Sequence, residues 1–208
     1  MKFVILADTH SRHRSIKLPR GDVLIHAGDV SYRGEKMEVQ DFLNWFDRQD
    51  FPHKIFIGGN HDFYFERAKP KDLDSIMPPG IIYLNDSGAV INGIRLWGSP
   101  VTPKFFNWAF NRTRGEAIRK HWNLIPANTD LLITHGPPYG ILDQLANDTH
   151  AGCKDLLNAI KKIKPKVHVF GHIHESYGTT KSLGIRFVNA SLSNELYELV
   201  NKPIVFEL

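Results

Sequence analysis

Five short apolar runs, each followed at once by a polar cluster, constrain the fold of this chain more than any other feature of its sequence. Near-continuous apolar strands are typical of sheets that are covered on both faces. The runs and their clusters are Phe3–Ala7 with Asp8-Thr9-His10, Val23–Ala27 with Gly28-Asp29, Lys54–Ile57 with Gly58-Gly59-Asn60-His61-Asp62, Leu131–Thr134 with His135-Gly136-Pro137-Pro138, and Val167–Phe170 with Gly171-His172-Ile173-His174. Because binding sites in α/β proteins form at strand ends, we expect these clusters to share one site.

Further strands and a few helices are expected between these runs. The strands are Ile81–Leu84, Ala89–Ile91, Arg95–Trp97, Arg186–Val188 and Ile204–Glu207. Apolar residues recur at helical spacing over 39–46 and over 153–163, where Pro165 closes the helix, and a shorter helix is expected over 115–122. The chain has no repeat and no linker, so we expect a single α/β domain over residues 1–208.

Charge and cysteine usage exclude several classes of protein. A formal net charge of +4, from 26 Lys and Arg against 22 Asp and Glu, indicates a mixed surface without a dedicated nucleic-acid patch. Cys153 is the only cysteine, which predicts a buried structural thiol in a cytoplasmic protein. The first apolar run is too short for a signal peptide or a membrane span, so no membrane partner is expected. The sequence leaves the oligomeric state open.

The five clusters combine carboxylate, imidazole and carboxamide groups, the ligands that suit Mn, Fe, Zn or Co. Asp8 and His10 are two positions apart, as are His172 and His174, so each pair lies on one side of an extended segment. Two strand residues span about 6.6 Å, whereas paired metals in hydrolases lie ~3.5–4 Å apart. Two such imidazoles can therefore each reach a different metal. A lone His or Asp at a strand end is more often a cap, a turn residue or solvated, whereas five such clusters in a fixed order indicate a metal site.

The clusters resemble the five signature motifs of the calcineurin-like metallophosphoesterases. The resembling motifs are Asp8-x-His10, Gly28-Asp29, Gly59-Asn60-His61-Asp62, His135-Gly136 and Gly171-His172-x-His174. Within that superfamily the chain is similar to the MPPED-type branch, the metallophosphoesterase domain-containing proteins. The similar stretches are residues 21–29, 106–111, 122–126, 134–138 and 168–175, and they are densest from residue 95 onward.

The resemblance implies a four-layer α/β/β/α sandwich, in which helices flank two mixed β-sheets. It also implies two divalent metals, with Mn favoured, and the attack of a metal-activated water on a phosphate ester. One metal would be held by Asp8, His10 and His174, the other by Asn60, His135 and His172, with Asp29 bridging both. His61 would be the catalytic histidine that contacts the scissile phosphate without binding metal.

One departure from the superfamily bears on the substrate. Protein phosphatases carry a second Asp after the Gly-Asp motif, and here Tyr32 stands in its place. This argues against a phosphoprotein phosphatase and leaves the partner that orients His61 open. Asp62 is one candidate for that partner, and a structural role is the other interpretation of Asp62. His26, inside an apolar strand, is interpreted as a hydrogen-bonded core histidine rather than as a group supporting the site.

An aromatic stretch offers a substrate-binding hypothesis. Phe105, Trp108 and Phe110 lie among polar and basic residues and could stack a nucleobase, although the same rings could cover the edge of a sheet as core. We therefore expect a phosphodiesterase acting on small diesters, 2′,3′-cyclic nucleotides among them. A phosphomonoesterase or a nuclease using the same site is the alternative, and a scaffold without activity is the third hypothesis.

Overall fold

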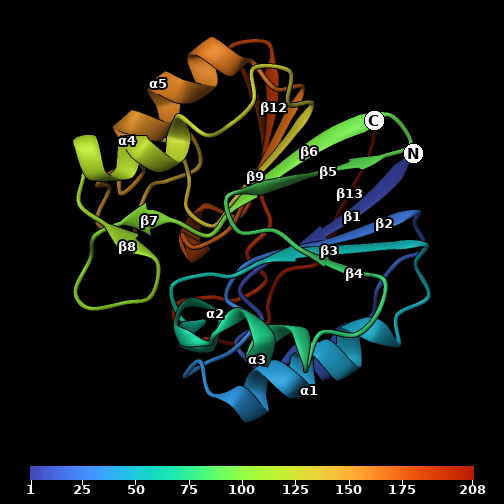
Figure 1. The fold of residues 1–208 in the computed structure, drawn as a ribbon. Helices are drawn as coiled ribbons and strands as arrows, with labels where there is room; N and C mark the ends of the chain where they lie inside the picture. Colours follow the sequence, from blue (N-terminus) through green and yellow to red (C-terminus); the bar gives the residue numbers. More distant parts are fainter.

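The computed structural model describes all of residues 1–208 and contains two large β-sheets packed face to face (Figure 1). The first sheet has five strands in the order β13-β1-β2-β3-β4. Their bounds are β1 Lys2–Leu6, β2 Val23–Ala27, β3 His53–Ile57, β4 Ile81–Tyr83 and β13 Ile204–Glu207. Strands β1 to β4 run parallel and β13 pairs antiparallel with β1, so the carboxyl ends of β1, β2 and β3 meet at one edge.

The second sheet has six strands in the order β11-β12-β10-β9-β6-β5. Their bounds are β5 Ser87–Ile91, β6 Ile94–Ser99, β9 Leu131–Thr134, β10 Val167–Phe170, β11 Gly178–Ser182 and β12 Ile185–Asn189. The four central strands are parallel, and the outer strands β5 and β11 are antiparallel to their neighbours. A separate pair, β7 (Thr102–Pro103) and β8 (Asn111–Arg112), forms a small third sheet.

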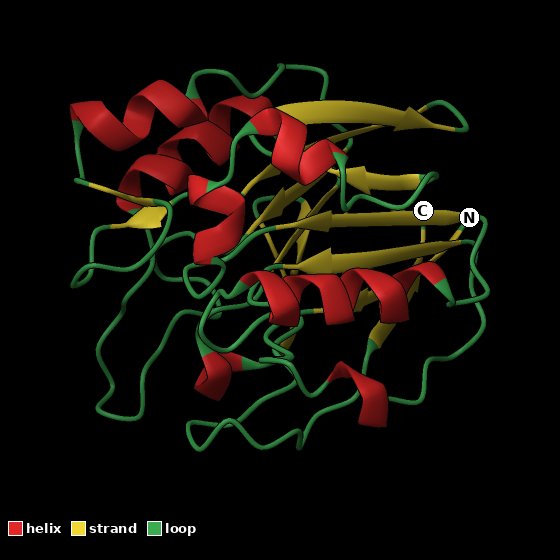
Figure 2. Cartoon of the chain, turned by 60° about the horizontal axis from the view of Figure 1, so that its bottom comes forward, coloured by secondary structure: helices red, strands yellow, loops and turns green.

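Helices cover the outer face of each large sheet (Figures 1 and 2). The helices are α1 Lys36–Asp47, α2 Phe63–Arg67, α3 Pro70–Asp74, α4 Glu116–Trp122 and α5 Lys154–Ile163. Helix α1 packs Phe42 and Phe46 against the first sheet, and α5 packs Leu156 and Ile160 against the second. The expected four-layer sandwich of two mixed sheets and flanking helices is therefore confirmed.

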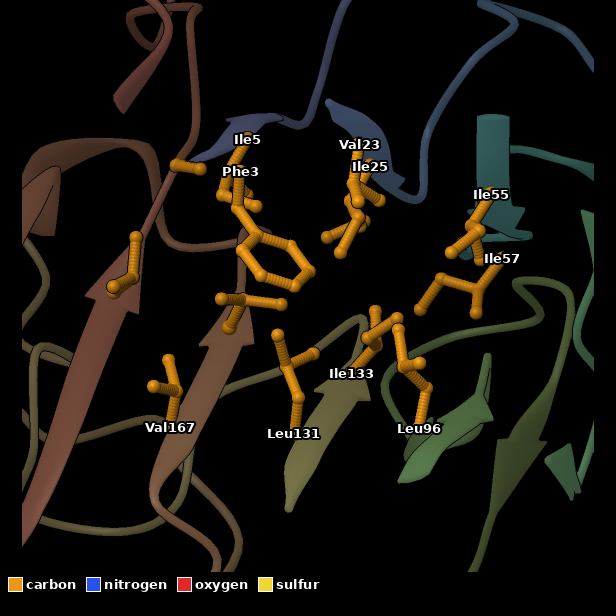
Figure 3. Close-up of a cluster of buried hydrophobic side chains, with 14 of the residues drawn as sticks. Phe3, Ile5, Val23, Ile25, Ile55, Ile57, Leu96, Leu131, Ile133 and Val167 are labelled. Atoms are coloured by element: carbon orange, nitrogen blue, oxygen red, sulfur yellow. The ribbon is translucent and has the colours of Figure 1, made fainter. Parts of the chain in front are cut away.

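A core of aliphatic side chains fills the space between the two sheets (Figure 3). Ile5 and Ile25 of the first sheet face Leu131 and Ile133 of the second, and all four are fully buried. The alternate residues, such as Leu24, point outward and pack under the helices. Because both faces of each sheet are covered, the strands need apolar residues at every position, which explains the continuous runs in the sequence.

The expected strands all form, whereas several short elements were not foreseen. Strand β11 alternates half-buried and exposed polar residues, and α2 and α3 have five residues each, too few to show a period. Cys153 is buried as expected, but it caps α5, and its Sγ accepts from the Leu156 N–H. Helix α5 ends before Lys164, which adopts a left-handed conformation ahead of Pro165.

None of the helices has the length and apolar composition that crossing a bilayer requires.

Replacing Phe42 by Ala tests the layer between α1 and the first sheet. Phe42 is fully buried and its ring packs on those of Phe46 and Phe56. Removing it should lower the free energy of unfolding by about 3–5 kcal/mol, measured by urea denaturation. Met37→Ala on the same helix is the control, because Met37 is 82% exposed, and it should change stability by less than about 0.5 kcal/mol. Similar small losses in both variants would contradict the packing described.

Candidate metal centre

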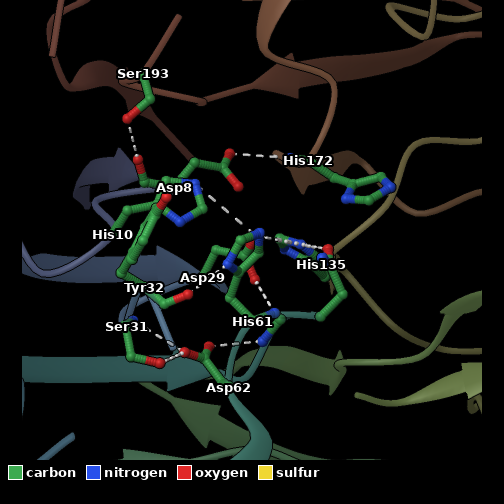
Figure 4. A network of polar contacts seen from close by, with 12 residues as sticks. Asp8, His10, Asp29, Ser31, Tyr32, His61, Asp62, His135, His172 and Ser193 are labelled. Carbon is green, nitrogen blue, oxygen red and sulfur yellow. Dashed lines mark hydrogen bonds and ion pairs between the residues drawn. The ribbon is translucent and has the colours of Figure 1, made fainter. Parts of the chain in front are cut away.

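The five polar clusters meet at one end of the sandwich, where the two sheets are joined (Figure 4). They follow β1, β2 and β3 of the first sheet and β9 and β10 of the second. The join is made by the backbone: the Ala7 N–H donates to the Ala190 carbonyl at 3.0 Å, and the Leu192 N–H donates to the Ala7 carbonyl at 3.0 Å. Strand ends from both sheets therefore face one another across a few ångströms.

Three sets of side chains bring ligand atoms to within 4.8 Å of one another. The sets are Asp8, His10 and His174; His10, Asp29 and His61; and Asp29, His135 and His172. Asp29 belongs to two of these sets and lies between the other ligands, at the position expected of a bridging group. Asn60 extends the third set, because its Oδ1 lies 2.9 Å from the Nε2 of His135. The structure therefore brings these residues together, and which metal each of them holds stays a prediction.

Backbone carbonyls fix which nitrogen of two of the histidines faces the site. Nδ1 of His135 donates to the Ala27 carbonyl at 3.0 Å, and Nδ1 of His174 donates to the Asn194 carbonyl at 2.9 Å. A carbonyl only accepts, so Nδ1 carries a proton in each ring and Nε2 is the nitrogen that faces the site. The Nε2 of His135 then faces two oxygens, Asn60 Oδ1 at 2.9 Å and Asp29 Oδ2 at 3.3 Å. One nitrogen and two oxygens this close need a shared cation, a proton or a metal ion, between them.

The carboxylate of Asp8, on the other side of the site, also lacks a partner that a cation would supply. Its Oδ2 accepts the His172 backbone N–H at 2.9 Å, while its Oδ1 is buried and has no hydrogen-bond partner. The Nε2 atoms of His10 and His174 lie 3.4 Å apart, and His174 Nε2 is 3.8 Å from the unpaired oxygen. A buried carboxylate oxygen without a partner is costly. The donor set therefore fits a divalent metal centre, with O and N ligands from both sheets.

The ionisation of these groups follows from their mutual charges. Burial acts to raise the pKa of Asp29, but the charges of the surrounding imidazoles, His135 first, together with the hydrogen bond of His135, outweigh it and hold that pKa well below its usual range. Burial acts to lower the pKa of His135, yet the charge and hydrogen bond of Asp29 raise it to about 9. Burial lowers the pKa of His172 to about 3. Burial also acts to raise the pKa of Asp8, but the hydrogen bond and charge of His174 help to hold it below its usual range. Both site carboxylates are thus ionised beside positive charge.

The backbone of the site is held in conformations that are uncommon for residues with a side chain. Four site residues have left-handed φ angles: Asp8 (56°), His10 (42°), Asp29 (57°) and His172 (71°). The glycines of the motifs allow the segments to approach closely. A Cβ on Gly28 would collide with the His135 ring, and one on Gly171 would collide with the Asp8 carboxylate. Glycine is therefore required at position 28 by contact and by a φ of 99°, and at position 171 by contact.

His61 is oriented by the backbone rather than by a carboxylate. Its Nδ1 donates to the Tyr32 carbonyl at 2.7 Å, which leaves Nε2 directed toward Asp29, with Oδ2 4.0 Å away. The imidazole also stacks on Trp108, with ring centroids 4.3 Å apart and planes at 30°. Tyr32, which stands where protein phosphatases carry their second Asp, thus orients His61 through its main-chain carbonyl. A pattern of side chains in the sequence cannot reveal such a role.

Asp62 has the structural role, not the orienting one. Its carboxylate accepts the backbone N–H groups of Val30, Ser31 and Gly59, and so ties the loop after β2 to the loop after β3. Burial, with the nearby charge of Asp29, raises the pKa of Asp62 to about 6. His26 is a core histidine as expected: it is fully buried and its Nε2 lies 3.0 Å from the Thr9 hydroxyl.

Sequence reasoning missed one segment, Ser193–Glu198, that closes the site. The Ser193 hydroxyl donates to the Asp8 carbonyl at 2.6 Å, and the Asn194 carbonyl holds His174. The ring of Tyr197 packs edge-on against His10, with centroids 4.7 Å apart and planes at 86°. Ser and Asn are typical turn residues, but no motif or spacing distinguishes this turn from others in the chain.

The aromatic stretch divides between core and cavity. Phe110 is 3% exposed and packs in the core beneath α1 and α2, so the substrate-contacting role expected of it is wrong. Phe105 is 60% exposed and, with Trp108, lines a cavity of about 240 Å³ over the metal centre. The walls of this cavity, called here the metal cavity, also include Tyr197 and two carboxylates, Glu175 and Glu195.

Two mixed sheets with helices outside, and a buried Asp, His and Asn cluster at their joined ends, define a metal-dependent phosphoesterase. The family model described as calcineurin-like phosphoesterase matches residues 1–176, and the chain belongs to that family. It is 41% identical, over 230 aligned residues, to metallophosphoesterase domain-containing protein 1 of Homo sapiens. That match covers 100% of this chain and 71% of the human protein, and the Mus musculus protein gives the same values.

Solved structures share the fold at low sequence identity. The phosphopantetheinyl hydrolase PptH from Mycobacterium tuberculosis superposes with a TM-score of 0.64 at 16% identity, covering 94% of this chain and 90% of that one. The protein TT1561 of Thermus thermophilus gives a TM-score of 0.58 at 11% identity, over 90% and 88% of the two chains. With the family established, the chain is a phosphoester hydrolase with a divalent metal centre.

Metal content tests the arrangement directly. Protein stripped of metal and reconstituted with Mn²⁺ should bind two ions per chain, because three ligand sets share Asp29 or His10. Asp29→Ala should bind fewer than two, since it removes a carboxylate that belongs to two of the sets. Asp74→Ala is the control, because Asp74 is an exposed carboxylate on α3 outside these sets. Elemental analysis gives the answer: wild-type protein that saturates at one ion, or an Asp29 variant that keeps two, contradicts the shared site.

Proposed function

We propose that this protein is a dinuclear metal-dependent phosphodiesterase that hydrolyses small diesters, with 2′,3′-cyclic nucleotides among its substrates. The observation that carries the proposal is the position of His61. Its Nε2 points into the ligand cluster, while its Nδ1 and ring face are held by Tyr32 and Trp108. A histidine so fixed beside a complete ligand set is suited to catalysis and argues against a scaffold.

Seven residues are proposed to hold the two metals. One ion would be bound by Asp8, His10 and His174, the other by Asn60, His135 and His172, with Asp29 shared. Divalent ions bound there would supply a water whose pKa is lowered toward about 7, and hence a nucleophile at neutral pH. The mixture of carboxylate, carboxamide and imidazole donors suits Mn, Fe, Zn or Co, and we favour Mn.

The proposed role of His61 follows from its hydrogen bonds. Because the Tyr32 carbonyl holds the Nδ1 proton, Nε2 is the only nitrogen free to act on a substrate. A proton at Nε2 could stabilise the phosphoryl oxygens or pass to the departing alkoxide. The stack on Trp108 keeps the ring from rotating during this transfer. Trp108 is therefore a positioning residue for His61, and Phe105 is the ring that remains free to contact a base.

The charge of the cavity walls favours diesters over monoesters. Glu175 and Glu195 line the metal cavity, and no Lys or Arg lines it. A diester carries one negative charge and a monoester nearly two near neutral pH, so these carboxylates repel a monoester more strongly. The absence of basic residues from the walls also disfavours the nuclease alternative, which needs cations along a nucleic-acid backbone. A phosphomonoesterase using the same residues is the second candidate.

His61→Ala should separate catalysis from metal binding. The variant should keep the metal content of the wild-type protein, because other residues complete both sets of ligands. Its kcat for an aryl phosphodiester should fall by about 10²–10⁴-fold, the usual contribution of a positioned general acid or base. Steady-state kinetics with parallel elemental analysis measure both quantities. Loss of metal would make His61 a ligand, and an unchanged rate would assign its role to another group.

A set of three substrates tests the class of ester. Under identical Mn²⁺ conditions, bis(4-nitrophenyl) phosphate and 2′,3′-cyclic AMP should be hydrolysed with higher kcat/KM than 4-nitrophenyl phosphate. Phe105→Ala should lower kcat/KM for cyclic AMP by about 5- to 150-fold, the range of one base stack. Trp108→Ala should lower kcat for every substrate alike, since it frees His61. Faster turnover of the monoester in the wild-type protein would overturn the assignment as a diesterase.

A further inference from the structure

A second cavity, called here the side cavity, adjoins the metal cavity. It has a volume of about 360 Å³ and shares two lining residues with the metal cavity, Phe105 and His172. Its remaining walls include the apolar side chains of Pro137, Leu145 and Ile173. A molecule whose phosphate lies against the metal ligands could therefore extend past His172 and Phe105 into an apolar space.

Two cations without carboxylate partners line this side cavity. Arg114 donates from Nη1 to the Gly152 carbonyl at 2.9 Å and from Nη2 to the Ala151 carbonyl at 3.1 Å, so its guanidinium is held in place by uncharged groups. Lys104, the second cation, is exposed and forms no ion pair. Both charges are therefore available to a ligand.

Other arginines in this region are neutralised. Arg112 pairs with Glu66 at 3.5 Å, and Arg119 pairs with Asp155 at 3.3 Å. Arg112 and Arg119 thus have carboxylate partners, whereas no Asp or Glu lines the side cavity beside Lys104 and Arg114. A guanidinium held by backbone carbonyls and an exposed ammonium beside apolar walls form a ready site for an anion carried on an apolar group.

The two cavities thus have opposite charge on their walls. Glu175 and Glu195 line the metal cavity, whereas Lys104 and Arg114 line the side cavity. From this difference, and resting on the proposed function for the place of the scissile phosphate, we propose that the side cavity binds the distal arm of the substrate. That arm is an aromatic or other apolar group that carries a second anion, a carboxylate or a further phosphate, at its far end.

Two non-hydrolysable probes test the proposal by binding alone. Phenylphosphonate and 4-carboxyphenylphosphonate share the phosphonate and the ring and differ only in the distal anion. Isothermal titration of the Mn-loaded protein should give a Kd about 5-fold lower for the carboxylated probe, as expected for a partly exposed ion pair. Lys104→Ala should remove most of this preference, and Lys104→Glu should reverse it. Lys161→Ala, which removes another exposed charge, on α5, should leave the preference intact.

The binding and turnover results distinguish a failure of the side-cavity proposal from a failure of the proposed diesterase function. Equal affinity for the two probes in the wild-type protein, or an unchanged preference in both Lys104 variants, overturns the side cavity as the site of a distal anion. The diesterase proposal is unaffected by that result, because it is judged by the turnover of bis(4-nitrophenyl) phosphate. If neither probe binds and that diester is not hydrolysed, the proposed function fails and the side-cavity proposal fails with it.

Discussion

The rest of the structure depends on the need to neutralise two buried carboxylates. Asp8 and Asp29 are 0% and 2% exposed, and both are ionised among imidazoles that come from both sheets. Isolated charges at this depth are costly to desolvate, so they persist only with compensating cations and hydrogen bonds. The two sheets must therefore be joined where these residues lie, and the backbone pairing of Ala7 with the segment after β12 makes that join.

One physical device recurs throughout the site: a backbone carbonyl fixes the Nδ1 proton of a histidine. The carbonyls of Ala27, Tyr32 and Asn194 do this for His135, His61 and His174. The first of these bonds crosses from one sheet to the other, so it aligns the sheets as well as the ring. Because a carbonyl carries no net charge, it sets the tautomer without adding to the negative charge already present. Orientation and electrostatics are thereby controlled by separate groups.

The sequence was sufficient to predict the covered strands and the candidate ligands that follow them, because both leave patterns that can be read locally. Continuous apolar runs mark covered strands, and the polar residues that follow them are the ligand candidates. The supporting groups leave no such pattern. The carbonyls of Tyr32 and Asn194 are present in every residue type, and their role depends on tertiary position alone. Phe110 shows the same limit, because adjacent aromatic residues in one loop face either solvent or core according to the fold around them.

The left-handed backbone at Asp8, His10, Asp29 and His172 has a consequence for how this enzyme could be stabilised. Each such conformation costs roughly 1 kcal/mol or more in a residue other than glycine, and the packed sandwich on either side must offset the total. Stability engineering that substitutes glycine at these positions would relieve the strain and remove the chemistry together. Stabilising substitutions in this fold belong in the helix layers and the outer strands, far from the joined ends of the sheets. Residues there can be changed for stability without changing the residues that carry out catalysis.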